Sequence, residues 1–143
     1  MSEENINALD EINKGAFMGM DALNFILEKV EDPGLKSILD EQYKDYKKIA
    51  KEIEAVYPKY DDDEPHETST MNKVMTWFGI EKKLFMESSD SKIAELLLQG
   101  VNMGIIEGKR ILNNKVIDKK VHDIVQKYVD MQEEHVEILK EYL

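Results

Sequence analysis

Cysteine is absent from the 143 residues of this chain. Its absence excludes disulfide bonds, thiol nucleophiles and thiolate ligands for zinc or iron–sulfur clusters. Long apolar runs are missing as well, so no segment approaches the length that a membrane span requires. The acidic N-terminus also lacks the apolar stretch of a secretory signal. We therefore expect a cytoplasmic protein in a reducing compartment, without membrane association.

Basic residues are scarce relative to acidic ones. The 19 Lys and Arg stand against 30 Asp and Glu, so the formal net charge is −11. Because an acidic surface repels nucleic acid and anionic lipid, we expect neither as a partner. The composition is nevertheless that of a folded protein, with 42% hydrophobic and 34% charged residues. A chain of this length fits one domain with one core.

Prolines are also few, since only three occur. Between them, apolar residues recur at three- and four-residue steps, which predicts amphipathic helices. We expect five of them, over residues 6–30, 35–57, 70–87, 92–112 and 116–143. Pro33-Gly34 supplies the first turn, and Asn113-Asn114 ends the fourth helix because asparagine tolerates left-handed conformations.

The chain repeats itself after 85 residues. The motif Gly-x-x-Met-Gly occurs at residues 15–19 and again at 100–104, and the same interval carries Tyr57 onto Tyr142. A register that holds across two helices and a turn indicates a duplicated helical hairpin. Two such hairpins predict an all-α four-helix bundle. Its parts are a hairpin over 6–57, a helical crossover over 58–89 and a second hairpin over 90–143.

Four glycines of the repeats, Gly15, Gly19, Gly100 and Gly104, lie on the apolar stripes of two predicted helices. A glycine inside a helix costs about 0.5–1 kcal/mol relative to alanine, so these positions need a physical reason. We expect that they let the first and fourth predicted helices approach closely, as small residues do at tight crossings. The alternative is that they leave room for a ligand or substrate.

Two helical hairpins joined by a long crossover resemble the ferritin-like superfamily. The Gly-x-x-Met-Gly repeats resemble, in addition, a group of uncharacterised bacterial, clostridial proteins. The resemblance to the superfamily implies a metal site with carboxylates from two helices and Glu-x-x-His from two others.

The matching positions keep the outline of that site but not its charges. Gln42-x-x-Asp45 and Gln132-x-x-His135 stand where the resemblance implies Glu-x-x-His, and Glu107 is the carboxylate of the fourth predicted helix. A neutral amide is a poor ligand for iron or manganese. We also place Glu107 roughly 15–20 Å from the other four residues, at 1.5 Å per residue. We therefore expect no functional di-iron site and no cofactor, with a divergent iron- or manganese-binding or redox protein as the alternative.

Gln42, Gln132 and His135 interrupt apolar stripes, so we expect them to be buried. Buried polar groups must find hydrogen-bond partners, and these three can pair with one another or with tyrosine hydroxyls. Such a network would set the register of the bundle.

Further apolar residues lie away from the core stripes. Phe17 and Phe25 lie on the opposite side of the first predicted helix, and Trp77, Ile80 and Leu84 form a second side of the crossover helix. They either pack on one another or form a homodimer interface, since large exposed apolar patches mark interfaces. No arrangement of nucleophile and base indicates catalysis. We expect a structural or protein-interaction module that is not an enzyme and that forms a homodimer.

Overall fold

Four long helices make up the described part of the chain, which in this computed structural model comprises residues 2–61 and 89–143. Neither range contains a strand, so the predicted all-α fold class is confirmed. None of the helices in these ranges is long and apolar enough to cross a membrane. The helix expected over residues 70–87 lies outside the described residues. The elements are α1 (Ser2–Leu27), α2 (Pro33–Val56), the short 3-10 helix η1 (Tyr57–Lys59), α5 (Asp90–Asn114) and α6 (Lys119–Lys140).

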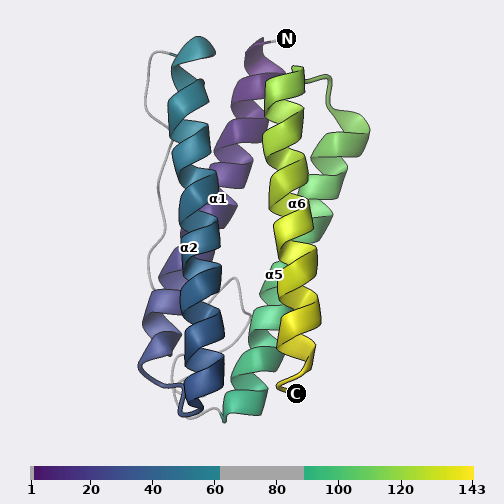
Figure 1. Cartoon of the computed structure of the whole chain (residues 1–143). Coiled ribbons are helices and arrows are strands. Elements are labelled where there is room, and N and C mark those ends of the chain that lie inside the picture. Colours follow the sequence, from purple (N-terminus) through teal and green to yellow (C-terminus); the bar gives the residue numbers. More distant parts are fainter. Residues whose placement is uncertain (1, 62–88) are drawn as a thin grey trace.

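The helices pair as two antiparallel hairpins, α1 with α2 and α5 with α6 (Figure 1). The most extensive contacts between helices lie within each hairpin. α2 ends at the end of the bundle opposite to the start of α5, so these two helices run in the same direction (Figure 1). This arrangement is the one expected for hairpins joined by a long crossover rather than a tight turn.

Side-chain caps set the beginnings of two helices. The Asp32 carboxylate accepts a hydrogen bond from the backbone N–H of Leu35 at 2.8 Å, and the Ser89 hydroxyl accepts one from the backbone N–H of Lys92 at 3.2 Å. These bonds satisfy N–H groups that have no partner in the first turn of a helix. α1 begins at Ser2 rather than at residue 6, with acidic residues in its first turn that suit the helix dipole.

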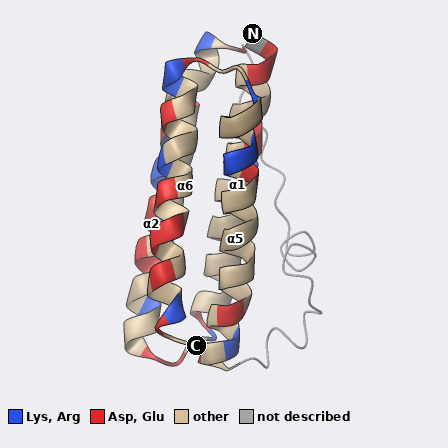
Figure 2. Ribbon diagram, turned by 90° about the vertical axis from the view of Figure 1, so that its right-hand side faces the viewer, with Lys and Arg blue, Asp and Glu red and all other residues tan. Residues whose placement is uncertain are grey.

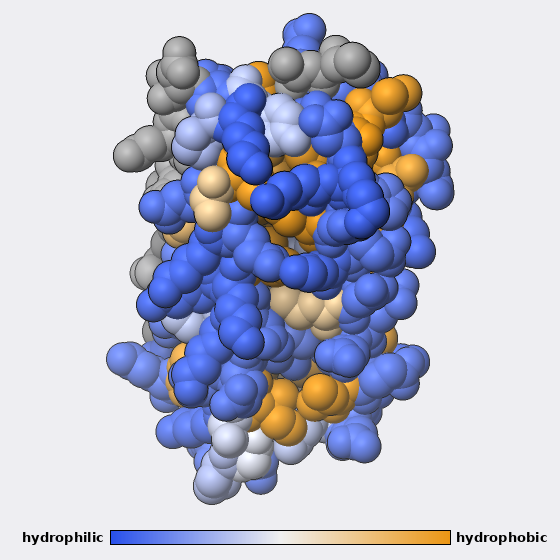
Figure 3. All heavy atoms as spheres, turned by 45° about the horizontal axis from the view of Figure 1, so that its top comes forward, coloured by the Kyte–Doolittle hydropathy of each residue, from blue (hydrophilic) through white to orange (hydrophobic). Residues whose placement is uncertain are grey.

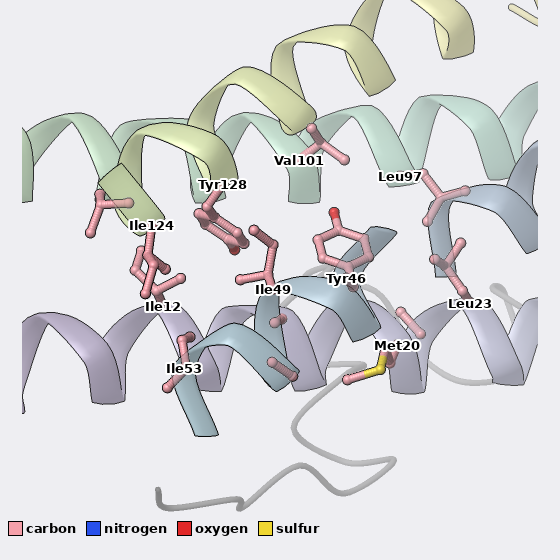
Figure 4. Close-up of a cluster of buried hydrophobic side chains, with 14 of the residues drawn as sticks. Ile12, Met20, Leu23, Tyr46, Ile49, Ile53, Leu97, Val101, Ile124 and Tyr128 are labelled. Atoms are coloured by element: carbon pink, nitrogen blue, oxygen red, sulfur yellow. The ribbon is translucent and has the colours of Figure 1, made fainter. Parts of the chain in front are cut away.

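One apolar core runs the length of the bundle, because each helix turns its apolar stripe inward. Side chains from all four helices interdigitate there (Figure 4). They include Ile12, Met20 and Leu23 of α1, Tyr46, Ile49 and Ile53 of α2, Leu97 and Val101 of α5, and Ile124 and Tyr128 of α6.

At one end of the bundle, Asp90 joins the two hairpins. Its two carboxylate oxygens accept hydrogen bonds from the backbone N–H groups of Glu31 at 3.1 Å and Asp32 at 2.9 Å. Asp32 is also the cap of α2. The first residue of α5 therefore holds the turn that starts α2.

At the other end, the start of α1 holds the connection between α5 and α6. Glu4 accepts a hydrogen bond from the backbone N–H of Val116, and Asn5 accepts one from that of Asp118, both at 2.8 Å. The Tyr60 hydroxyl donates to the Asp118 carboxylate at 2.9 Å. Both ends of the bundle are thus closed by bonds between the hairpins.

Replacing Asp90 with alanine should lower the free energy of unfolding by about 1–2 kcal/mol, because each of the two lost bonds is worth about 0.5–1.5 kcal/mol. Urea unfolding should show a lower midpoint with an unchanged slope. Asp123→Ala is the matched control, since Asp123 pairs with Lys119 and His122 of its own helix. A midpoint for Asp90→Ala equal to that of the control would contradict the role given to Asp90.

Candidate functional site

A layer of polar side chains crosses the middle of the bundle between α2 and α6. Gln42, Gln132 and His135 are 3%, 1% and 2% exposed, so the burial expected from their place on apolar stripes is present. Tyr46 and Tyr128 are buried beside them. We call these five residues the polar layer.

His135 connects the polar layer to the surface. Its Nε2 lies 3.0 Å from Oδ2 of Asp45, whose side chain is 41% exposed. The edge of the Tyr46 ring packs against the imidazole, with 5.4 Å between ring centroids. Because the carboxylate accepts the proton on Nε2, a neutral imidazole leaves Nδ1 as an acceptor. Nδ1 is buried and has no partner among the described residues.

Burial lowers the pKa of His135, and the hydrogen bond and charge of Asp45 oppose that effect only in part. The imidazole is therefore neutral in the folded protein near pH 7. A second proton would have to enter at the unpartnered Nδ1, inside the core.

Gln132 lies between the two tyrosine hydroxyls of the layer. Burial raises the pKa of Tyr46 and of Tyr128, and a hydrogen bond from Gln132 opposes the effect at both. The two rings are 6.4 Å apart between centroids. Both phenols consequently remain protonated and neutral.

Three of the repeat glycines provide the space for this layer. A Cβ atom at Gly15 would clash with the Tyr128 hydroxyl, and one at Gly104 would clash with the Gln132 amide. At Gly19 it would lie 2.8 Å from the Tyr46 ring, closer than real Cβ atoms approach. The nearest groups are therefore side chains of α2 and α6, and not the backbone of the opposite glycine helix.

The expectation that Gly15, Gly19 and Gly104 let α1 and α5 approach closely stays a prediction, but the structure adds that side chains of α2 and α6 lie over these glycines. Large polar side chains from the neighbouring helices occupy the space that a Cβ atom at these glycines would need. Gly100 is buried as expected. Gly108 continues the four-residue spacing of Gly100 and Gly104. The sequence alone did not assign it to helix packing, yet a Cβ at Gly108 would clash with Cγ2 of Val129.

Little space remains for a ligand inside the layer. The enclosed cavity beside Gly19, Gln42 and Tyr46 has a volume of about 10 Å³, which holds about one water molecule. The Nε2 group of Gln42, a donor, has no partner among the described residues. The alternative that the glycines leave room for a substrate thus finds no space in this cavity.

Glu107 is closer to the polar layer than expected. Gly104 is level with Gln132, so Glu107 lies three residues, or about 4.5 Å, beyond that level. His135 lies three residues beyond Gln132 in the opposite direction, which puts about 9 Å between the levels of Glu107 and His135. This difference in height is smaller than the separation of roughly 15–20 Å expected from the sequence, because the Gln132 side chain lies against Gly104.

Glu107 faces α1 rather than the metal-ligand positions of the motif. Burial raises its pKa, the nearby Glu11 raises it further, and Lys14 and Arg110 oppose the shift. Its charge and that of Glu11 also raise the pKa of Tyr128. Glu107 is therefore a half-buried carboxylate beside the exposed charges of Glu11, Lys14 and Arg110.

The side chains of the polar layer do not fit a dinuclear metal centre. Gln42 and Gln132 are neutral amides, and the layer contains no carboxylate, because Asp45 is bound to His135 at its edge and Glu107 lies elsewhere. The donor group of Gln42 would repel a cation. Among residues 2–61 and 89–143, no three His, Asp or Glu side chains are grouped as metal ligands.

The surface carries two grooves on either side of α6. The groove between α5 and α6 has a volume of about 790 Å³ and combines acidic residues of α6 with the apolar Ile105, Val136 and Ile138. The groove between α2 and α6 has a volume of about 540 Å³ and contains Asp45. Both are open to solvent, and neither was predicted.

The fold has a counterpart among solved structures. It is similar to a protein described as a dodecameric thioferritin, the bacterioferritin-related protein from Bacteroides fragilis. The TM-score is 0.77 over 99% of this chain and 85% of that chain, at 13% sequence identity. The similarity shows the ferritin-like fold and confirms that part of the prediction. No protein-family model and no curated protein matches the chain, and the clostridial subgroup and the degenerate metal motif stay predictions.

Gly15→Ala should destabilise the protein by about 1–3 kcal/mol, because overpacking a filled core costs that much. In the middle of a helix the same change normally stabilises by about 0.5–1 kcal/mol. Tyr128→Phe removes the oxygen that the new methyl would meet. A double-mutant cycle in urea should therefore show that Gly15→Ala is less harmful in the Tyr128→Phe background. If Gly15→Ala destabilises both backgrounds equally, the Tyr128 hydroxyl does not fill the space over Gly15.

Acid should destabilise the protein through His135. The folded-state pKa lies below the unfolded value of 6.5, so the unfolded chain takes up the proton first. The contribution of His135 is therefore present above pH 6.5 and is lost as the pH falls below that value. Urea unfolding at about pH 7 and about pH 5.5 should show a smaller loss of stability for His135→Gln than for the wild type. His122 is exposed on the same helix, so His122→Gln should lose as much stability between the two pH values as the wild type. If His135→Gln also loses as much as the wild type, His135 is not the source of the acid destabilisation.

Proposed function

We propose that this chain is a self-associating structural subunit with a ferritin-like fold, in which a packed polar layer stands in place of a dinuclear metal centre. The observation that carries the proposal is the seating of Tyr128 and Gln132 over Gly15 and Gly104. Large side chains occupy the middle of the bundle, where a ferritin-like protein would need space for ions and their ligands.

The chemistry of the layer supports a structural role. Its amides and phenols are neutral, so they attract neither a cation nor a substrate charge. Gln132 hydrogen-bonds to both tyrosines, whereas Nε2 of Gln42, Oε1 of Gln132 and Nδ1 of His135 have no partner among the described residues. Buried polar groups that do pair can specify the register of a bundle. The layer joins α2 to α6, and so joins the first hairpin to the second.

Self-association is supported by the solved counterpart, which is described as dodecameric. The predicted interface residues Phe17 and Phe25 are half-buried and pack against the core of their own chain, which favours the intramolecular alternative for these two. Trp77, Ile80 and Leu84 lie outside the described residues. The homodimer remains a proposal, and its surface is not placed on Phe17 and Phe25.

A second candidate function is the binding of a single transition-metal ion at His135. One observation favours it, because Nδ1 of His135 is buried without a partner while Nε2 is oriented by Asp45. Metal-bound histidines are commonly oriented by a carboxylate in this way. The other potential ligands argue against metal binding, because Gln42 and Gln132 are neutral amides.

One preparation tests both candidates. The protein is purified without chelators, and its iron and manganese content and its sedimentation are measured for the wild type and for His135→Ala, with His122→Ala as control. We expect an oligomer with far less than one metal ion per chain, in equal amounts for all three proteins. One or more ions per chain, lost only in His135→Ala, would establish the metal-binding candidate instead, and a monomer at all concentrations would overturn the proposed self-association.

A further inference from the structure

Four lysines form an exposed ridge on α2, and one of them, Lys48, lines the groove between α2 and α6 together with Asp130 and Glu134 of the same chain. The four lysines are Lys44, Lys47, Lys48 and Lys51, and all of them are exposed. Lys44 pairs with Asp40 and Glu41 of its own helix. The other three have no ion-pair partner within residues 2–61 and 89–143. We call these four residues the lysine ridge.

α6 carries a ridge of opposite charge with the same spacing. Asp130, Glu133, Glu134 and Glu137 are all exposed, and the last three follow Asp130 at three, four and seven residues. The lysine ridge follows Lys44 at the same three intervals. Figure 2 shows acidic residues gathered along α6 and α2, whereas the middle of α5 carries no charge. We call the four carboxylates the acidic ridge.

Two contacts within the chain place the ridges at the same height along the bundle. Asp45 meets His135 at 3.0 Å, and Glu52 meets Lys127 at 2.8 Å. Because α2 and α6 are antiparallel, each step up one helix is a step down the other. Residue 44 is therefore level with about residue 136, and residue 51 with about residue 128 or 129.

We propose that the two ridges dock onto each other between two copies of this chain, around a two-fold axis parallel to the helices. This inference rests on the proposed self-association. Rotation about such an axis keeps every residue at its height and lays α2 of each copy on the partner's α6. Lys44 then faces the partner's Glu137, and Lys51 faces the partner's Asp130, within about two residues or 3 Å in height.

The inner lysines find partners in the same arrangement. Lys47 is level with the partner's Glu133, and Lys48 lies within two residues of the partner's Glu134. Since the interface is isologous, all four pairs occur twice. The same helices also carry Glu52 and Lys127, which already attract each other within one chain and meet again across the axis.

The surface next to the acidic ridge can receive the lysine side chains. The groove between α5 and α6 offers Ile105, Val136 and Ile138 beside the carboxylates. Lysine methylenes can cover such apolar side chains while their ammonium groups reach the carboxylates. The face of the molecule that Figure 3 shows is mainly hydrophilic with small apolar patches.

A second copy fits this surface better than an unrelated cationic helix, because the matching charges are already in the chain at matching spacing and height. Exposed ion pairs are individually weak and are screened by salt. The interface therefore depends on several pairs acting together and should weaken as ionic strength rises.

A charge-swap experiment tests the proposal. Lys48→Glu/Lys51→Glu leaves the lysine ridge with two lysines and two glutamates, so two of its four pairs become repulsive. Asp130→Lys/Glu134→Lys makes the same two pairs repulsive from the other side, since it places lysines opposite Lys51 and Lys48. At low ionic strength we expect a wild-type dimer in sedimentation, at least about tenfold weaker self-association for each variant alone, and a dimer again when the two variants are mixed. Circular dichroism of each variant checks that it is folded.

Two controls separate local pairing from net charge. The Asp130→Lys/Glu134→Lys variant adds four charges and brings the net charge from −11 to −7, so general repulsion falls while dimerisation should still be lost. Lys36→Glu/Lys59→Glu has the same net charge as Lys48→Glu/Lys51→Glu but leaves both ridges intact. Lys36→Glu/Lys59→Glu should therefore dimerise more strongly than Lys48→Glu/Lys51→Glu.

Three outcomes would overturn the proposal, and they differ in what else they remove. A wild type that is monomeric at every concentration would overturn both this interface and the proposed self-association. An oligomer that tolerates both charge swaps would leave self-association standing and refute this interface. Variants that are monomeric alone and also when mixed would refute the pairing of the ridges with each other.

Discussion

The structure depends on the fit of large polar side chains into positions that have no Cβ. Tyr128 and Gln132 of α6 occupy the space over Gly15 and Gly104, and Tyr46 of α2 occupies the space over Gly19. These contacts join α1 to α6, α5 to α6 and α1 to α2. Together they set the heights of all four helices relative to one another. A methyl group at any of these glycines would displace a buried side chain. Because the core is close-packed, that displacement would also shift the register between the helices.

The same fit decides what chemistry the centre can perform. Neutral amides and protonated phenols fill the region between the helices, and the buried imidazole of His135 is held by a carboxylate at the surface. Such a layer holds two hairpins together but offers a cation little charge. The described residues thus combine a ferritin-like fold with a central layer whose side chains differ from a dinuclear ligand set.

Much of the fold could be predicted because helical periodicity is a local property. The stripes of α2 and α6 predicted that Gln42, Gln132 and His135 would be buried, and the 85-residue repeat predicted two hairpins. The register between helices could not be predicted, because it depends on which side chain fills which glycine. For that reason neither the height of Glu107 relative to Gln132 nor the side chains that lie over the glycines could be derived from the sequence.

On the surface, too, the sequence predicts features within one helix but not the alignment of one helix with another. The spacing of the lysines on α2 and of the carboxylates on α6 is visible in the sequence, but their common height follows only from the contact of Asp45 with His135. Phe17 and Phe25 seemed exposed on a helical wheel, yet they pack against the core, since the surroundings of a helix are not given by its own period.

The most direct test of the packed polar layer is the anomalous scattering of a crystal of the protein soaked in Mn²⁺. Our account predicts no manganese peak between α2 and α6, with the Gln132 amide in place over Gly104 and the Tyr128 hydroxyl over Gly15. A manganese peak beside Nδ1 of His135, with Gln132 turned to coordinate it, would contradict it.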